Sequence, residues 1–236
     1  MINSIRLDGP RRDPDSGKPA VQAVIFLHGY GSDGNDLISL APYFAESLPD
    51  AKFFSPNAPE PGETGLGCQW FTLQGYDPDL MRRDPVRMVD AFSIMYEGAK
   101  IAADSLNDYL DIILKDLGLP PNKLALIGFS QGTMMAIHVA LRRTKALGAV
   151  VGYSGALLGA KYIKRETVAP PPLLLVHGSS DDVVPVNALT HMQETLDTAD
   201  IPYSAHVIPN HGHGIEQVGA TLGRSFLEDK LTRADQ

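Results

Sequence analysis

The sequence predicts an α/β fold in which a mostly parallel central sheet carries helices on both faces. Four short segments are almost continuously apolar, which is typical of strands buried on both faces of a sheet. These segments are residues 21–28, 124–128, 149–153 and 173–177. Glycine or serine ends or follows each of them, and a loop or a helical stretch comes next. Strands that alternate with helices in this way indicate a parallel sheet.

The segments between these strands predict helices. In the longest of them, apolar side chains recur at intervals of three and four residues and so form one stripe. That stripe comprises Ala102, Leu106, Tyr109, Ile113 and Leu117. The predicted helices span residues 36–47, 90–117, 131–144 and 187–198. A strand over 203–208 and a closing helix over 216–231 continue the alternation, which fits a single domain covering residues 1–236.

Residues 56–90 interrupt this alternation and predict a long loop excursion. The segment is rich in proline and glycine and shows no sustained period. Loops of this length inside a compact domain are usually functional. The excursion carries the apolar side chains Trp70, Phe71 and Leu73, which have two open interpretations: a small core of the loop itself, or a lid or acyl-binding wall.

Composition and charge exclude several classes of protein. A net charge of −8 argues against a nucleic-acid partner, because binding to a phosphate backbone requires clustered lysine and arginine. A single cysteine, Cys68, excludes an intrachain disulfide and fits a reducing compartment. No apolar run approaches the roughly 20 residues that cross a bilayer, and residues 1–18 lack the apolar core of a signal peptide. We therefore expect a cytoplasmic protein without a membrane span.

The pentapeptide Gly128–Gly132 has the pattern G-x-S-x-G and stands between a predicted buried strand and a predicted helix. The bare pattern occurs by chance, but this context is specific. A sharp turn between strand and helix holds a serine in a strained conformation with its hydroxyl outward, and the flanking glycines let the two elements approach. Ser130 is therefore predicted to be a nucleophile.

A serine hydroxyl needs a base to take its proton, and the base needs a partner that orients it. Two carboxylates, Asp181 and Asp182, follow the strand over 173–177. Two histidines, His211 and His213, lie in a glycine-rich loop before the closing helix. The residues alone leave both choices open.

The other histidines are not expected to transfer protons. His28 and His177 end strands at the same edge of the predicted sheet, where a supporting hydrogen-bond role is expected. The remaining three lie inside predicted helices or a strand.

A carbonyl under attack also needs two backbone N–H groups aimed at its oxygen. Gln131 supplies one, because it follows the nucleophile. The glycine-rich loop over residues 28–34 supplies the second, with Tyr30 as the candidate.

These motifs resemble the carboxylesterase, phospholipase and acyl-protein thioesterase family of α/β-hydrolases. The resemblance spans most of the chain. It rests on four further segments in order beside the Gly128–Gly132 turn: residues 26–31, 65–71, 181–185 and 212–215.

The resemblance implies an α/β-hydrolase fold and assigns roles residue by residue. It selects Asp181 as the acid and His213 as the base, and it implies that the Tyr30 and Gln131 N–H groups form the oxyanion hole. It further implies that Trp70, Phe71 and Leu73 bind substrate near the acyl pocket. Tyr30 stands where leucine is common in the family, and the 56–90 region is longer than in its smallest members. Both departures bear on the acyl-chain preference and leave the catalytic residues unchanged.

The predicted function is hydrolysis of a small-molecule carboxylic ester or thioester through an acyl-serine, without cofactor or metal. An acyl-protein thioesterase or a lysophospholipase is an alternative with the same triad. A zinc hydrolase using His211 and His213 is disfavoured, because no third ligand stands at recognised spacing. A non-catalytic binding protein would leave the complete constellation unexplained. A homodimer formed around the Trp70 segment is left open.

Overall fold

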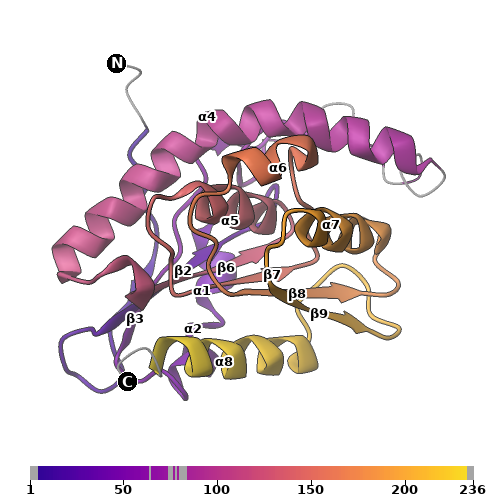
Figure 1. Ribbon diagram of the computed structural model, residues 1–236. Helices are drawn as coiled ribbons and strands as arrows, with labels where there is room; N and C mark the ends of the chain where they lie inside the picture. Colours follow the sequence, from indigo (N-terminus) through magenta and orange to yellow (C-terminus); the bar gives the residue numbers. More distant parts are fainter. Residues whose placement is uncertain (1–4, 64, 74–76, 78, 80–83, 233–236) are drawn as a thin grey trace.

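The computed structural model describes residues 5–63, 65–73, 77, 79 and 84–232. Its centre is a seven-stranded sheet with the order β1-β3-β2-β6-β7-β8-β9 (Figure 1). The strands are β1 (Arg11–Arg12), β2 (Gln22–Leu27), β3 (Ala51–Phe54), β6 (Leu124–Phe129), β7 (Ala149–Tyr153), β8 (Leu173–Gly178) and β9 (Tyr203–Ile208). Neighbours pair in parallel except β1, which is antiparallel to β3. The mostly parallel sheet predicted from the sequence is confirmed.

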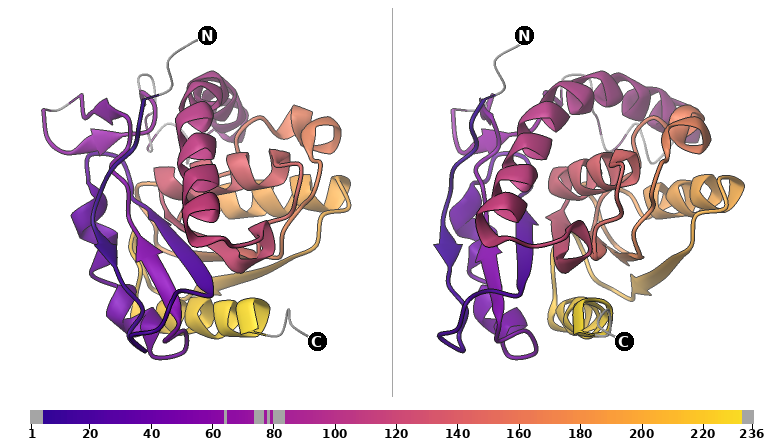
Figure 2. Two further views of the ribbon diagram at one scale, coloured as in Figure 1. Left: turned by 90° about the vertical axis from the view of Figure 1, so that its left-hand side faces the viewer. Right: turned by 60° about the vertical axis from the view of Figure 1, so that its left-hand side comes forward.

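Helices cover both faces of this sheet. Figures 1 and 2 show one group of helices above the sheet and a second group, with α8, below it. The first group is α4 (Pro85–Leu117), α5 (Gln131–Arg142), α6 (Ala160–Glu166) and α7 (Asn187–Thr198). The second group is α1 (Gly34–Ile38), α2 (Ala41–Ala45) and α8 (Gln217–Thr232). A 3-10 turn, η1 (Pro121–Lys123), precedes β6, and a separate hairpin pairs β4 (Glu60–Pro61) with β5 (Cys68–Gln69).

The core is divided by the sheet into two layers. In β2, Ile25 and Leu27 pack with the α4 and α5 side, whereas Val24 and Phe26 pack with the α1, α2 and α8 side. Every residue of β2 is buried, as the unbroken apolar run predicted. At about 25 cal/mol per Å² of apolar surface removed from water, this two-sided burial is the main contribution that stabilises the sheet.

The structure corrects the predicted elements at three places. The helix predicted over 36–47 is divided into α1 and α2, and Pro42 stands in the first turn of α2, where a missing N–H is tolerated. The helix predicted from residue 90 begins at Pro85, so the end of the predicted 56–90 loop is helical. Strand β3 and helix α6 were not predicted, because both are short and lack a strong apolar period. The single-domain organisation stays a prediction.

Within the described residues, no helix combines the length and the apolar composition needed to cross a bilayer.

His138 is a residue of α5 that faces α4 and is 3% exposed. Its ring packs edge-on against Tyr96, with centroids 5.5 Å apart. Burial, assisted by the nearby Arg142 cation, lowers the pKa of His138 from its ordinary value of 6.5 to about 3. The imidazole is therefore neutral in the folded protein at neutral pH.

We predict that this buried imidazole makes stability fall in weak acid. Below pH 6.5 the unfolded chain binds a proton that folded His138 binds only near pH 3. The free energy of unfolding should therefore decrease by up to about 1.4 kcal/mol per pH unit across that interval, and it should be fully restored above it. Urea titrations at several pH values measure this slope. His138→Leu should flatten it, and an unchanged slope in that variant would contradict the assignment.

Candidate active site

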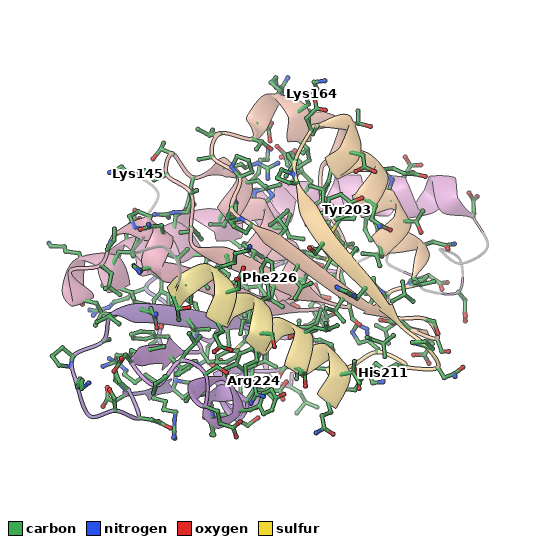
Figure 3. The ribbon with its side chains drawn as sticks, turned by 60° about the horizontal axis from the view of Figure 1, so that its bottom comes forward. Lys145, Lys164, Tyr203, His211, Arg224 and Phe226 are labelled. Atoms are coloured by element: carbon green, nitrogen blue, oxygen red, sulfur yellow. The ribbon has the colours of Figure 1, made fainter. Side chains whose placement is uncertain are left out.

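The predicted site residues gather at one edge of the sheet. Ser130 follows β6, Asp181 lies in the loop after β8, and His213 lies in the loop after β9. These strands are parallel, so their carboxyl ends meet at the same edge, where α/β sheets bind ligands. Figure 3 labels His211 in the loop between β9 and α8 that also carries His213.

Ser130 occupies the strained turn that the glycine pattern predicted. Its backbone has φ 52° and ψ −116°, a conformation that non-glycine residues rarely adopt. Its N–H donates to the carbonyl of Tyr153 at 2.9 Å. A Cβ on Gly132 would lie 1.8 Å from the Leu27 oxygen, and one on Gly128 would lie 2.5 Å from the Gly132 oxygen. The flanking glycines are therefore required for the close approach of β2, β6 and α5.

One histidine and one aspartate are paired. His213 Nδ1 lies 2.8 Å from Asp181 Oδ2. The other aspartate oxygen accepts hydrogen bonds from the backbone N–H groups of Val183 at 3.0 Å and Val184 at 2.8 Å. This pair is the one that the family resemblance selected.

The two competing residues are arranged differently. The ring of His211 has its Nε2 3.2 Å from the Gly214 carbonyl oxygen, and Asp182 is exposed. In this structure Asp181 is therefore paired with His213, and His211 makes its contact within its own loop.

The His213 ring lies beside the tight turn at Ser130. Its centroid is 4.8 Å from that of Phe129, the residue before Ser130, and the two rings are inclined by 44°. His213 thus contacts the turn on one side and Asp181 on the other.

His177, at the end of β8, contacts Asp181 and so has the supporting position expected of it. It is buried, and its Nε2 lies 2.8 Å from the Val184 carbonyl oxygen and 3.3 Å from Asp181 Oδ2. Because a carbonyl only accepts, this nitrogen carries the proton and donates. Burial raises the pKa of Asp181, but hydrogen bonds from His177 and His213 outweigh burial and hold the pKa below its ordinary value of 3.8. Asp181 is therefore a carboxylate at neutral pH.

His28 supports the opposite side of the site. Its Nε2 accepts a hydrogen bond from the N–H of Ala58 at 3.0 Å, so its Nδ1 carries the proton, 2.7 Å from the Gly29 oxygen. Burial lowers the pKa of His28 and keeps the ring neutral. This arrangement matches the supporting role expected for a histidine at the end of β2.

The glycine-rich loop after β2 lies against Ser130. A Cβ on Gly29 would be 3.4 Å from the Ser130 Cβ, and Tyr30 is the residue that follows Gly29 in the chain. The β5 backbone holds this loop, because Gly31 N–H donates to the Cys68 carbonyl at 2.9 Å and Cys68 N–H donates to the Ser32 carbonyl at 2.6 Å. Gln131 is the first residue of α5, where backbone N–H groups have no partner within the helix. Of the two predicted oxyanion donors, Gln131 thus follows Ser130 directly, and Tyr30 follows Gly29, which lies beside Ser130.

The side chain of Gln131 has a role that sequence reasoning missed. Its Oε1 accepts from the Trp70 N–H at 2.9 Å, and its Nε2 donates to the Phe71 carbonyl at 2.7 Å. Trp70 Nε1 also donates to the His28 carbonyl at 3.0 Å. These bonds join the excursion to both loops of the site.

The aromatic rings of this segment belong to the core. Trp70 is 1% exposed and Phe71 is 2% exposed, so neither ring offers surface to a substrate or to a second copy in this structure. A Cβ on Gly98 would lie 2.7 Å from the Phe71 Cβ, which shows how closely this residue packs on α4. Leu73 is half-buried and is the one of the three predicted substrate contacts that keeps accessible surface. Residues 74–76, 78 and 80–83 of the excursion lie outside the described residues.

The Gln131 side chain and its hydrogen bonds to the Trp70 N–H and the Phe71 carbonyl form a clamp between α5 and the excursion. We predict that this clamp requires an uncharged side chain at position 131. Gln131→Glu keeps an acceptor for the Trp70 N–H but places a carboxylate oxygen against the Phe71 carbonyl. The loss of a buried donor should lower the free energy of unfolding by about 2 kcal/mol. Urea denaturation measures the effect, and an unchanged midpoint would show that the clamp contributes nothing.

Two further observations concern a cysteine nucleophile and a metal site. Burial, with a smaller contribution from Asp33, raises the pKa of the Cys68 thiol, which is the opposite of what activates a nucleophilic cysteine. Within the part of the chain that the structure describes, no three histidine, cysteine, aspartate or glutamate side chains gather as a metal site would require.

Comparison with known proteins finds relatives that are esterases and thioesterases. The phospholipase/carboxylesterase family matches residues 14–230. The chain is 26% identical to esterase YpfH of Escherichia coli over 208 residues, which are 87% of this chain and 80% of that protein. It is 29% identical to acyl-protein thioesterase 1 of Saccharomyces cerevisiae over 180 residues, which are 72% of this chain and 74% of that protein. The crystal structure of esterase PE8 is similar with a TM-score of 0.85 at 35% identity, covering 96% of this chain and all of that one.

The fold is that of the α/β-hydrolases, a mostly parallel sheet with helices on both faces. The chain belongs to the phospholipase/carboxylesterase family, and it is therefore a hydrolase of the esterase and thioesterase type.

Proposed function

We propose that this protein is a serine carboxylesterase that hydrolyses carboxylic esters or thioesters of small to medium acyl chains through an acyl-Ser130 intermediate. The observation that carries this proposal is the 2.8 Å contact between His213 and Asp181 beside a serine with φ 52°. A base oriented by a buried carboxylate and facing a strained serine turn is the arrangement that acyl transfer requires.

In the first half-reaction, Ser130 Oγ attacks the substrate carbonyl carbon while His213 Nε2 takes its proton. The carbonyl oxygen becomes an oxyanion that accepts hydrogen bonds from the Tyr30 and Gln131 N–H groups. The intermediate then collapses, and the C–O or C–S bond breaks. The departing alcohol or thiol takes the proton from His213 and leaves an ester on Ser130.

In the second half-reaction, water replaces the alcohol. His213 takes a proton from water as the water oxygen attacks the acyl carbon, and then returns it to Ser130 Oγ as the acid leaves. Asp181 stays ionised throughout, because its hydrogen bonds lower its pKa. Its carboxylate fixes the Nδ1–H tautomer of His213 and stabilises the imidazolium.

Three substrate classes are compatible with this chemistry. The relatives include an esterase and acyl-protein thioesterases, which favour an ester and an acyl-protein thioester respectively. A lysophospholipid presents the same carbonyl. We favour small or medium acyl groups, because the Trp70 and Phe71 rings are buried and so offer no surface to a long acyl chain. Cytoplasmic localisation and a homodimer stay predictions.

A series of acyl esters and matched acyl thioesters, graded by chain length, tests this proposal. We expect kcat/KM to be highest for short or medium chains. Preference for acylated peptides or lysophospholipids over every simple ester would select an alternative substrate. The absence of turnover on the whole series would favour a binding protein.

A further inference from the structure

Ser154 lies between the proposed nucleophile and the proposed acid. It follows β7, and β7 is the strand between β6, which precedes Ser130, and β8, which precedes Asp181. An imidazole that reaches from Asp181 to Ser130 must therefore cross the carboxyl end of β7. No role for Ser154 follows from the sequence motifs.

The Ser154 backbone is strained and fixed. Its φ is 47°, in the left-handed region that disfavours L side chains. Its N–H donates to the Val176 carbonyl at 2.9 Å, and the preceding carbonyl, that of Tyr153, accepts from Ser130 N–H at 2.9 Å and from Thr133 Oγ1 at 2.8 Å. The turn is thus bonded to both neighbouring strands. Strain of this kind persists only where the surroundings impose it, and it concentrates at functional sites.

The Ser154 hydroxyl is buried and has no partner among the residues that the structure describes. The residue is 1% exposed, and its Oγ makes no hydrogen bond to any described residue. Burying a hydroxyl in this way costs free energy, so such a group needs an explanation.

The imidazole ring of His213 suggests a partner for the Ser154 hydroxyl. In histidine, Cε1 lies between the two ring nitrogens. Nδ1 of His213 faces Asp181 beyond β8, and in the proposed mechanism Nε2 faces Ser130 beyond β6. The Cε1–H bond between them is then directed at the carboxyl end of β7.

We propose that Ser154 Oγ accepts a weak hydrogen bond from the Cε1–H of His213 and thereby positions and stabilises the imidazolium. The C–H group becomes a better donor when the ring is protonated, so the contact is strongest as Ser130 transfers its proton. Ser154 is a positioning residue, because it touches the base and not the reacting carbonyl. This inference rests on the proposed function.

Three variants test it. Ser154→Ala removes the hydroxyl and keeps the strained backbone, whereas Ser154→Gly removes the hydroxyl and relieves the strain. Ser55→Ala is the matched control, because Ser55 is also fully buried and its Oγ has no partner within the described part of the chain, but it follows β3, three strands away from β7. For each protein, kcat and KM for a short aryl ester are measured from about pH 5 to about pH 9, together with Tm.

We expect both Ser154 variants to lose about fivefold in kcat with little change in KM. The acidic limb of their pH profiles should move to lower pH, because the imidazolium has lost an acceptor. Ser154→Gly should keep the wild-type Tm, which separates this loss from unfolding, and Ser55→Ala should keep the wild-type kcat. Wild-type kcat and an unmoved limb in both Ser154 variants would overturn the inference alone. A wild-type protein without turnover would overturn it together with the proposed function.

Discussion

Ser130→Ala is expected to lower kcat/KM for an aryl ester by on the order of 10⁴-fold. The variant lacks the only atom that can carry the acyl group in the proposed mechanism. Residual hydrolysis would come from the oxyanion donors and from binding alone. Stability should change little, because the left-handed backbone at this position strains alanine and serine similarly.

The Ser130 result is measured as initial rates at equal enzyme concentration, with Tm recorded for both proteins. Ser55→Ala serves as the control for removing a buried serine hydroxyl elsewhere. Near-wild-type hydrolysis by Ser130→Ala would assign the nucleophile to another residue.

Asp181→Asn should lower kcat by about 10³- to 10⁴-fold while leaving KM within a few-fold. The asparagine amide keeps the shape of the carboxylate, but only one of its two terminal atoms is an oxygen that can accept a hydrogen bond. It would place N–H donors against either the His213 ring or the Val183 and Val184 N–H groups. The imidazole would lose both its tautomer and its counter-charge.

Asp182→Asn is the matched control, since it makes the same change at the exposed neighbouring residue. Its kcat should stay within about twofold of the wild-type value. Equal losses in the two variants would show that the loop tolerates no substitution and would remove the case for Asp181 as the orienting acid.

Strands β7 and β8 were predictable because both of their faces are buried, and their bounds match the apolar runs except that β8 extends one residue further. β9 also has the predicted bounds, although it is an edge strand in which no residue is fully buried. β3 was missed, since it has only four residues and lies beside the two-residue edge strand β1. Its position depends on pairing with β2, a contact between distant parts of the chain that local periodicity does not encode.

The tight turn at Ser130 was predictable from sequence because its glycines answer a local steric demand. The pairing of His213 with Asp181 and not with Asp182 was not predictable from the residues alone, because both carboxylates follow β8 directly, and only the family resemblance selected between them. The burial of Trp70 depends on hydrogen bonds to His28 and Gln131, which are distant in the sequence. An aromatic pair in an irregular loop carries no local signal that separates a core from a binding wall.

Labelling with an aryl fluorophosphonate, followed by intact mass and peptide mapping, tests the central claim most directly. The proposed mechanism predicts one phosphonyl group per chain, located on Ser130, with esterase activity lost in proportion to labelling. Full esterase activity in a protein that carries no adduct on Ser130 would contradict it.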